Sequence, residues 1–221
     1  MRFKIRLVSL ILICGLIFSD SIKYNNPNNY GVIGLINIPT ARFYEESSSA
    51  FTAYKGEPDR KITITMMPYD WFEASVFYTS IKGRPYGSGF NQDYKDKGFN
   101  AKFRLKEEGN FPAIAIGFND LAGTGIYSSE YVVGSYGINK LDLHFGIGWG
   151  RLNGGQFQRN NPLADLDESF LTRCFSWNCD QRDGQGGTFR WKDYFSGEKV
   201  GFFGGFSYLF NNNWLFNFEH D

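Results

Sequence analysis

Apolar and polar residues alternate in short segments along most of the chain. In the clearest segment, residues 141–149, large apolar side chains at the odd positions alternate with Asp142, His144 and two glycines. A period of two places each set of side chains on one face of an extended strand. The pattern predicts nine strands, at residues 49–55, 62–66, 72–78, 99–105, 114–118, 129–136, 141–149, 200–209 and 214–219.

The connections between these strands also alternate, in length. Every second connection is short, and the short ones are residues 68–70, 107–110, 137–139 and 210–213. Three of the four others are long, at residues 81–96, 120–128 and 151–199. Outer-membrane barrels have short periplasmic turns and long outer loops. The sequence therefore predicts an all-β, antiparallel up-and-down transmembrane β-barrel in the bacterial outer membrane, with a periplasmic N-terminus.

A soluble lipocalin-like barrel or β-sandwich is the alternative fold with the same alternation. It would bury the aliphatic face of each strand in a core and expose charged residues such as Lys102, Arg104 and Asp142 to solvent. Alternation along the strands cannot separate these two folds. The alternating loop lengths favour the membrane fold.

The number of predicted strands is odd. Bacterial single-chain barrels have an even number, and an unpaired edge in lipid leaves backbone groups without hydrogen bonds. We therefore expect an incomplete barrel, in the N-terminal part of a longer protein. The expected organisation is a signal peptide at 1–21, a periplasmic linker and entry segment at 22–47, and a partial outer-membrane β-barrel at 48–221.

The first residues have the three regions of a secretory signal peptide. Arg2, Lys4 and Arg6 precede a mostly apolar run at residues 7–18, and small and polar residues follow at 19–21. An uncleaved anchor is the alternative, although the run is shorter than the roughly 20 apolar residues that a spanning helix needs. Cys14 follows the bulky Ile13, so we do not expect a lipid-anchored cysteine.

Composition narrows the class of protein further. The mean hydropathy of −0.35 is too low for a helical membrane protein, yet 19% of the residues are aromatic and 26 are glycine. These values suit a barrel in which alternate residues meet lipid and aromatic residues gather at the two interfaces. The formal net charge is zero, so no basic surface indicates nucleic acid as a partner. Outer-membrane lipid is the partner that this class implies.

Polar residues on the predicted inward face are the candidate functional residues. Glu73, Lys102, Arg104, Asp142 and His144 are expected to line the lumen. Ser75 and Ser207 could face the same lumen, but nothing in the sequence brings either hydroxyl within the reach of His144 that nucleophilic catalysis needs. We expect no enzyme activity, no cofactor and no metal. We expect His144 to lie in a hydrogen-bonded cluster with Asp142 and with Lys102 or Arg104.

The longest predicted outer loop carries two cysteines and several aromatic residues. In an exported protein we expect Cys174 and Cys179 to form a local disulfide, with two free thiols as the alternative. No histidine or second cysteine pair lies near them, which disfavours zinc. The loop aromatics could stack on sugar rings, but we favour a loop that folds over the barrel mouth. They are Phe170, Phe175, Trp177, Trp191, Tyr194 and Phe195.

Several strings along the chain carry a family resemblance. In order, they are residues 34–42 (GLINIPTAR), 96–99 (DKGF), 115–125 (AIGFNDLAGTG), 146–152 (GIGWGRL) and 201–205 (GFFGG). This ordered set resembles the YjbH-like exopolysaccharide-associated outer-membrane proteins. The resemblance implies a β-barrel that acts in production or export of an extracellular polysaccharide, together with other polysaccharide-export proteins. A general porin or structural barrel without sugar specificity is the alternative. Some relatives are lipoproteins, and this sequence departs from them at Ile13.

Overall fold

The computed structural model describes residues 24–85, 91–121, 123–154, 157–173, 193–211 and 214–221. Its strands are β1 (Ser48–Lys55), β2 (Asp59–Tyr69), β3 (Phe72–Pro85), β4 (Asp93–Lys106), β5 (Ala113–Leu121), β6 (Ser129–Ile138), β7 (Leu141–Gly148), β8 (Gln158–Asn160), β9 (Lys199–Phe210) and β10 (Trp214–His220). Two short 3-10 helices, η2 (Gly150–Asn153) and η3 (Glu168–Leu171), lie between β7 and β9. The predicted signal peptide and the two loop cysteines, Cys174 and Cys179, lie outside the described residues.

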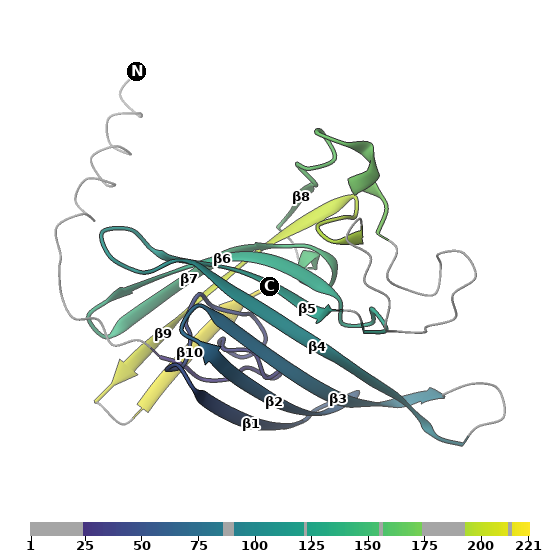
Figure 1. Ribbon diagram of the computed structural model, residues 1–221, viewed down its shortest axis with the longest axis horizontal. Helices are drawn as coiled ribbons and strands as arrows, with labels where there is room; N and C mark the ends of the chain where they lie inside the picture. The colour runs from purple at the N-terminus through teal and green to yellow at the C-terminus, as the bar shows by residue number, and fades with distance from the viewer. Residues whose placement is uncertain (1–23, 86–90, 122, 155–156, 174–192, 212–213) are drawn as a thin grey trace.

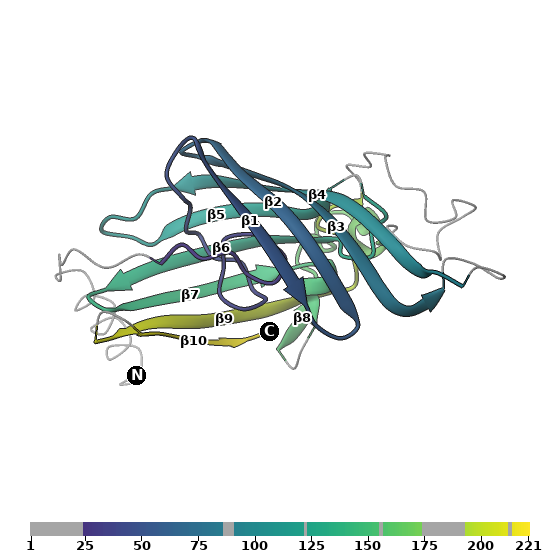
Figure 2. The ribbon, with the colours of Figure 1, turned by 90° about the horizontal axis from the view of Figure 1, so that it is seen from below.

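The strands form one antiparallel sheet in the order β1-β2-β3-β4-β5-β6-β7-β9-β10. The short β8 pairs with the first residues of β9. The sheet is strongly curved, as Figures 1 and 2 show. The prediction of an all-β antiparallel fold with neighbouring strands side by side is confirmed. The sheet is not closed: among the described strands, β1 pairs only with β2, and β10 only with β9.

All nine predicted strands are present, but one predicted loop is wrong. The sequence suggested a long connection at residues 81–96, whereas β3 continues to Pro85 and β4 begins at Asp93. Tyr94 pairs with Ile81 and both are buried. The outward positions beside Tyr94 hold polar residues such as Lys95 and Lys97, so the strand continues where the apolar alternation stops. β8 was missed because it consists of three polar residues.

The two faces of the sheet have the reverse of the usual soluble pattern. Charged and polar side chains on the inward face are buried, among them Lys61, Glu73 and Asp142. Large apolar side chains on the outward face are exposed. They include Phe51, Ile62, Ile64, Met66, Val76, Tyr78, Phe99, Leu143, Phe145, Tyr208, Phe216 and Phe218. Scattered exposed apolar residues are normal in soluble proteins, but a continuous apolar face with a buried polar one is informative.

Residues 24–44, which we call the inner segment, fill the space inside the curve of the sheet. In Figures 1 and 2 this segment is the purple coil enclosed by the strands. It has no regular strand and only isolated bridges, between Pro27 and Ile33 and between Gly34 and Pro39. Its buried apolar side chains pack with inward side chains of β2, β5, β6 and β9 in one core. That core consists of Leu35, Ile38, Ala41, Phe43, Met67, Ala113, Ala115, Tyr131, Val133, Leu152 and Phe203.

Candidate functional site

The inner segment is bound to the first strands of the sheet through its backbone. Thr65 donates a hydrogen bond to the Gly31 carbonyl at 2.5 Å, and the Ile33 N–H donates to Glu73 Oε1 at 3.2 Å. Gly31 has φ of +78°, and a Cβ there would lie 2.4 Å from the Thr63 side chain. Only glycine fits this close approach in the left-handed region. The backbone of the inner segment therefore follows the surface of β2 and β3 closely.

Lys102 and Glu73 form a buried ion pair beneath the inner segment. Lys102 Nζ lies 2.8 Å from Glu73 Oε2, with side chains 1% and 2% exposed. The same ammonium donates to the Arg42 carbonyl at 2.8 Å and lies 4.4 Å from the Phe43 ring centroid. A buried charge needs such compensation, since an unpaired one costs several kcal/mol. This pair joins β3, β4 and the inner segment.

A second buried network surrounds Arg42. Its Nε donates to Asp142 Oδ2 at 2.9 Å and its Nη2 donates to Asp142 Oδ1, so the guanidinium is bidentate. Nη2 also lies 2.6 Å from Glu108 Oε2. Burial by itself lowers the pKa of Arg42, but the hydrogen bonds and charges of Asp142 and Glu108 raise it above its ordinary value. The guanidinium is thus held as a fixed positive charge between two carboxylates.

His144 belongs to this second network. Its Nδ1 lies 2.8 Å from Ser135 Oγ, and its Nε2 lies 3.8 Å from Asp142 Oδ2. Ser135 Oγ also accepts a hydrogen bond from the Ala41 N–H at 2.9 Å. The set has the composition of a Ser-His-Asp triad, but its serine is bonded to the inner segment and its aspartate to Arg42. The arrangement suits a structural network, and the absence of enzyme activity stays a prediction.

The five residues predicted to line the lumen occupy three places. Glu73 and Lys102 form the first network, and Asp142 and His144 belong to the second. Arg104 shares the Phe43 ring with Lys102, at 4.8 Å from the centroid, but it is 21% exposed and its Nη1 lies 3.0 Å from Glu107 Oε1. The expected contact of His144 with Lys102 or Arg104 is wrong, because the cation beside Asp142 is Arg42.

Sequence reasoning missed several residues of the interior, among them Arg42, Glu108, Ser135 and Glu219. The Glu219 carboxylate on β10 accepts hydrogen bonds from the backbone N–H groups of Ile36, Asn37 and Ile38. Arg42 and the Ile36–Ile38 stretch both lie in the string at residues 34–42, which marked the segment without assigning roles. The partners on β7 and β10 are too distant in sequence for any local pattern to join them.

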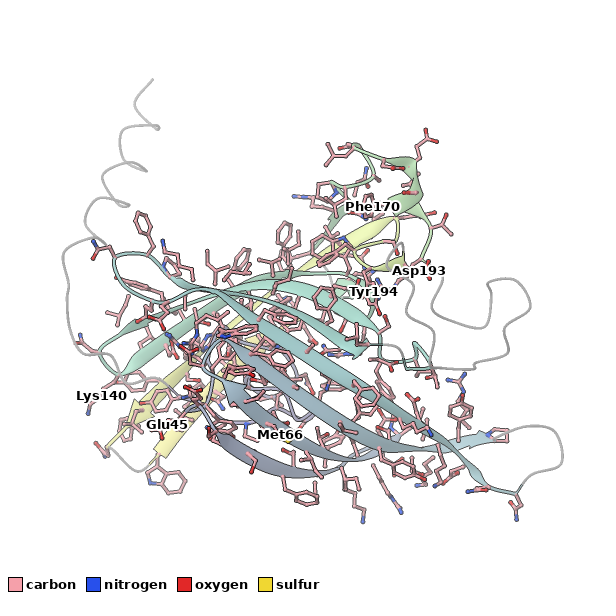
Figure 3. The ribbon with its side chains drawn as sticks, viewed as in Figure 1. Glu45, Met66, Lys140, Phe170, Asp193 and Tyr194 are labelled. Carbon is pink, nitrogen blue, oxygen red and sulfur yellow. The ribbon has the colours of Figure 1, made fainter. Side chains whose placement is uncertain are left out.

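The described residues between β7 and β9 pack on the end of the sheet that carries the long connections. Figure 3 shows Phe170, Asp193 and Tyr194 at this end, opposite to Glu45 and Lys140. Phe195 makes edge contacts with Phe118 and Trp149, at 5.5 Å and 5.0 Å between ring centroids, and Tyr194 packs on Phe118. Tyr194 and Phe195 are therefore folded against the strands, while a loop that folds over the barrel mouth stays a prediction. Phe175, Trp177 and Trp191 lie outside the described residues.

An ion pair fastens this connection to β6. Arg173 lies 2.7 Å from Glu130 Oε2 and donates to Ser128 Oγ at 2.6 Å. Glu130 also accepts the Phe195 N–H at 2.8 Å. Two segments of the connection, on either side of residues 174–192, are thereby held against the same carboxylate.

Neither a spanning helix nor a multi-ligand metal cluster is found in the described part of the chain. None of its helices is long and apolar enough to cross a membrane. It also contains no group of three or more His, Cys, Asp or Glu residues that could hold a metal ion.

Comparison with known proteins identifies the family. The model of the YjbH family, described as "Exopolysaccharide biosynthesis protein YbjH", matches residues 26–221. The "Uncharacterized lipoprotein YjbH" of Escherichia coli (strain K12) is 32% identical over 151 residues, which cover 66% of this chain and 22% of that protein. No solved structure matches the chain. Because the family model extends over nearly all of the described residues, the chain belongs to the YjbH family of exopolysaccharide biosynthesis proteins.

Proposed function

We propose that this chain forms part of an outer-membrane β-barrel that acts in the production or export of an extracellular polysaccharide. The observation that carries the polysaccharide part is the family match over residues 26–221. The matched stretch spans 22% of the length of the E. coli relative, which is named as a lipoprotein. A signal peptide at residues 1–21 would deliver the chain to the envelope, with the N-terminus in the periplasm.

The membrane part of the proposal rests on the reversed faces of the sheet. Phe145 is 63% exposed, whereas its neighbour His144 is 5% exposed. Burial of apolar surface drives soluble folding, so a soluble sandwich would cover Phe145 and expose the charges. A barrel in lipid does the opposite and keeps polar groups inside. This facing supports the membrane fold over the soluble alternative.

Aromatic residues at the end with short turns also fit a membrane interface. Tyr69 and Trp71 stack at 5.5 Å beside the β2–β3 turn, and Trp214 begins β10 with 74% of its surface exposed. Tryptophan and tyrosine are enriched at the level of lipid headgroups. A lipid-embedded sheet must also have both edges hydrogen-bonded, so the proposal requires a partner strand for β1 and another for β10.

The filled interior favours the polysaccharide role over the general porin. A porin needs an open, water-filled lumen. Here the inner segment occupies the inward face, with Ile33 and Ile38 fully buried and Arg42 held in an ion-pair network. Small solutes would find this part of the interior closed. The inner segment suits a barrel with a dedicated task better than one for general diffusion.

The direct test deletes the complete gene and measures extracellular polysaccharide and small-solute uptake separately. We expect polysaccharide to fall with solute uptake unchanged, and the intact protein to fractionate with the outer membrane and shift in gel mobility on boiling. Unchanged polysaccharide with reduced uptake would favour the porin instead. Recovery of the protein as a soluble periplasmic species would refute the barrel.

A further inference from the structure

Two of the family-like strings meet at the end of the sheet that carries the long connections. Asp96, from the string at 96–99, lies near the start of β4, and Asp120, from the string at 115–125, lies near the end of β5. Thr124 in the following turn donates to Asp96 Oδ1 at 2.8 Å. In the same turn, the Tyr127 N–H donates to Asp120 Oδ2 at 3.1 Å. One turn therefore holds both carboxylates, each by a single oxygen.

The second oxygen of each carboxylate is buried without a hydrogen-bond partner. Asp96 and Asp120 are both 1% exposed, and neither Asp96 Oδ2 nor Asp120 Oδ1 has a partner among the described residues. These two side chains, both among the described residues, form no hydrogen bond with each other. Buried polar atoms are paired in the great majority of cases, because an unpaired one costs free energy. Two such oxygens in one place indicate a missing partner.

An uncharged side chain points to the same place independently. Thr79 lies directly opposite Asp96 in the register of β3 and β4, and both residues face inward. Thr79 is completely buried, and its Oγ1 has no hydrogen-bond partner within the described part of the chain. Asn119, next to Asp120, is 7% exposed with an unpartnered Oδ1, while its amide nitrogen donates to Ser129. The unpartnered atoms here are all oxygens.

The nearby cation does not neutralise these carboxylates directly. Lys61 Nζ lies within a ring of three aromatic side chains, 4.3 Å from the Tyr30 centroid, 4.6 Å from Phe77 and 3.9 Å from Tyr127. The rings stabilise the ammonium by cation–π attraction. Lys61 forms no salt bridge with Asp96 or Asp120, which are both in the described part of the chain. Lys61 therefore acts on both carboxylates by charge at a distance and fills neither unpartnered oxygen.

Glycines leave the space that the Asp120 carboxylate occupies. A Cβ on Gly123 would lie 1.6 Å from Asp120 Oδ1, and one on Gly98 would lie 2.5 Å from the same atom. Both glycines belong to the two strings. The strings thus supply both carboxylates and the room for Asp120 Oδ1.

We propose that Asp96 and Asp120, with Thr79 Oγ1 as a neutral oxygen on the residue opposite Asp96, bind a divalent cation of the calcium class. Calcium takes six to eight oxygen ligands, including carboxylates, amide and carbonyl oxygens, and water. The site contains no histidine or cysteine and only two carboxylates, which excludes the ligand set of structural zinc. The cation would join β4 to the β5–β6 turn beneath the long connections.

The test uses the complete protein, refolded in detergent without lipopolysaccharide. Its thermal unfolding is measured in calcium and in chelator, and direct binding is measured by terbium luminescence with calcium as the competitor. We expect calcium to raise the melting temperature by several degrees, with a weaker effect of magnesium. Asp120→Asn should abolish this shift, and Asp70→Asn, at a carboxylate that is 60% exposed at the opposite end, should keep it.

Thr79→Val keeps the shape of the side chain and removes one oxygen. It therefore tests the site even if the aspartate variant fails to fold. It should fold and weaken calcium binding several-fold. The proposal is overturned if the wild-type protein binds neither terbium nor calcium, or if Asp120→Asn and Thr79→Val bind as the wild type does. If the wild-type protein binds no calcium and Asp120→Asn has a higher melting temperature than the wild type, the Asp120 carboxyl is protonated instead. That result would also overturn the proposal. These outcomes do not depend on the polysaccharide role.

Discussion

Replacing Arg42 with methionine leaves Asp142 and Glu108 without their shared cation. The side chains of Arg42, Asp142 and Glu108 are 3%, 0% and 9% exposed, so water cannot screen the charges that remain. Removing one partner of a buried ion pair typically costs about 3–5 kcal/mol. Methionine has a similar length and fills the space of the arginine side chain. The loss of stability therefore comes mainly from the missing charge and not from a cavity. We expect the free energy of unfolding to fall by that amount.

Arg104→Met is the matched control. Arg104 is also an arginine beside Phe43, but its partners Glu107 and Asp70 are 73% and 60% exposed. Exposed pairs contribute roughly 0–1 kcal/mol. A double variant that also replaces Asp142 with leucine should recover part of the loss, because it removes a buried charge that has lost its partner.

The assay is urea unfolding of the complete protein from lipid vesicles, followed by the fluorescence of its tryptophans. The urea midpoint and the slope of the free energy against urea concentration are both measured. A midpoint that shifts at constant slope indicates a change in stability, whereas a changed slope indicates a change in the unfolded state. If Arg42→Met costs no more than Arg104→Met, then the network around Arg42 does not fix the inner segment, and the filled interior argued above loses its main support.

The remaining predictions use simpler measurements. Leu143→Arg, on the outward face, should lower the free energy of unfolding by roughly 2–4 kcal/mol near the bilayer midplane. The same urea assay measures this loss. An equal loss in a detergent-free soluble form would contradict the outward facing of Leu143. Gly146→Ser adds a side chain on the inward face of β7, where a Cβ would lie 2.3 Å from the Phe203 ring. We expect a loss of about 1–3 kcal/mol from overpacking, and an unchanged urea midpoint would show that the ring moves freely. Cys174 and Cys179 should stay unlabelled by alkylation before reduction, as intact mass would show; two labelled thiols would refute the bond.

The sequence by itself determined the strands and their facing. Alternation is a local property, since successive side chains of a strand point to opposite faces. It therefore located all nine predicted strands and placed His144 and Phe145 on opposite faces of β7. The same rule failed at residues 81–96, because polar residues at outward positions hide a strand whose backbone pairing continues.

Tertiary structure alone decided what fills the interior. Residues 34–42 were recognisable as a string, but nothing local predicted that Arg42 pairs with Asp142, 100 residues away, or that Asn37 binds Glu219, 182 residues away. His144 acquired Ser135 as its partner through the register of β6 and β7. The inner segment has no periodic pattern because it forms no regular strand. Its position is set by buried charges and close backbone contacts that exist only once the sheet has curved around it.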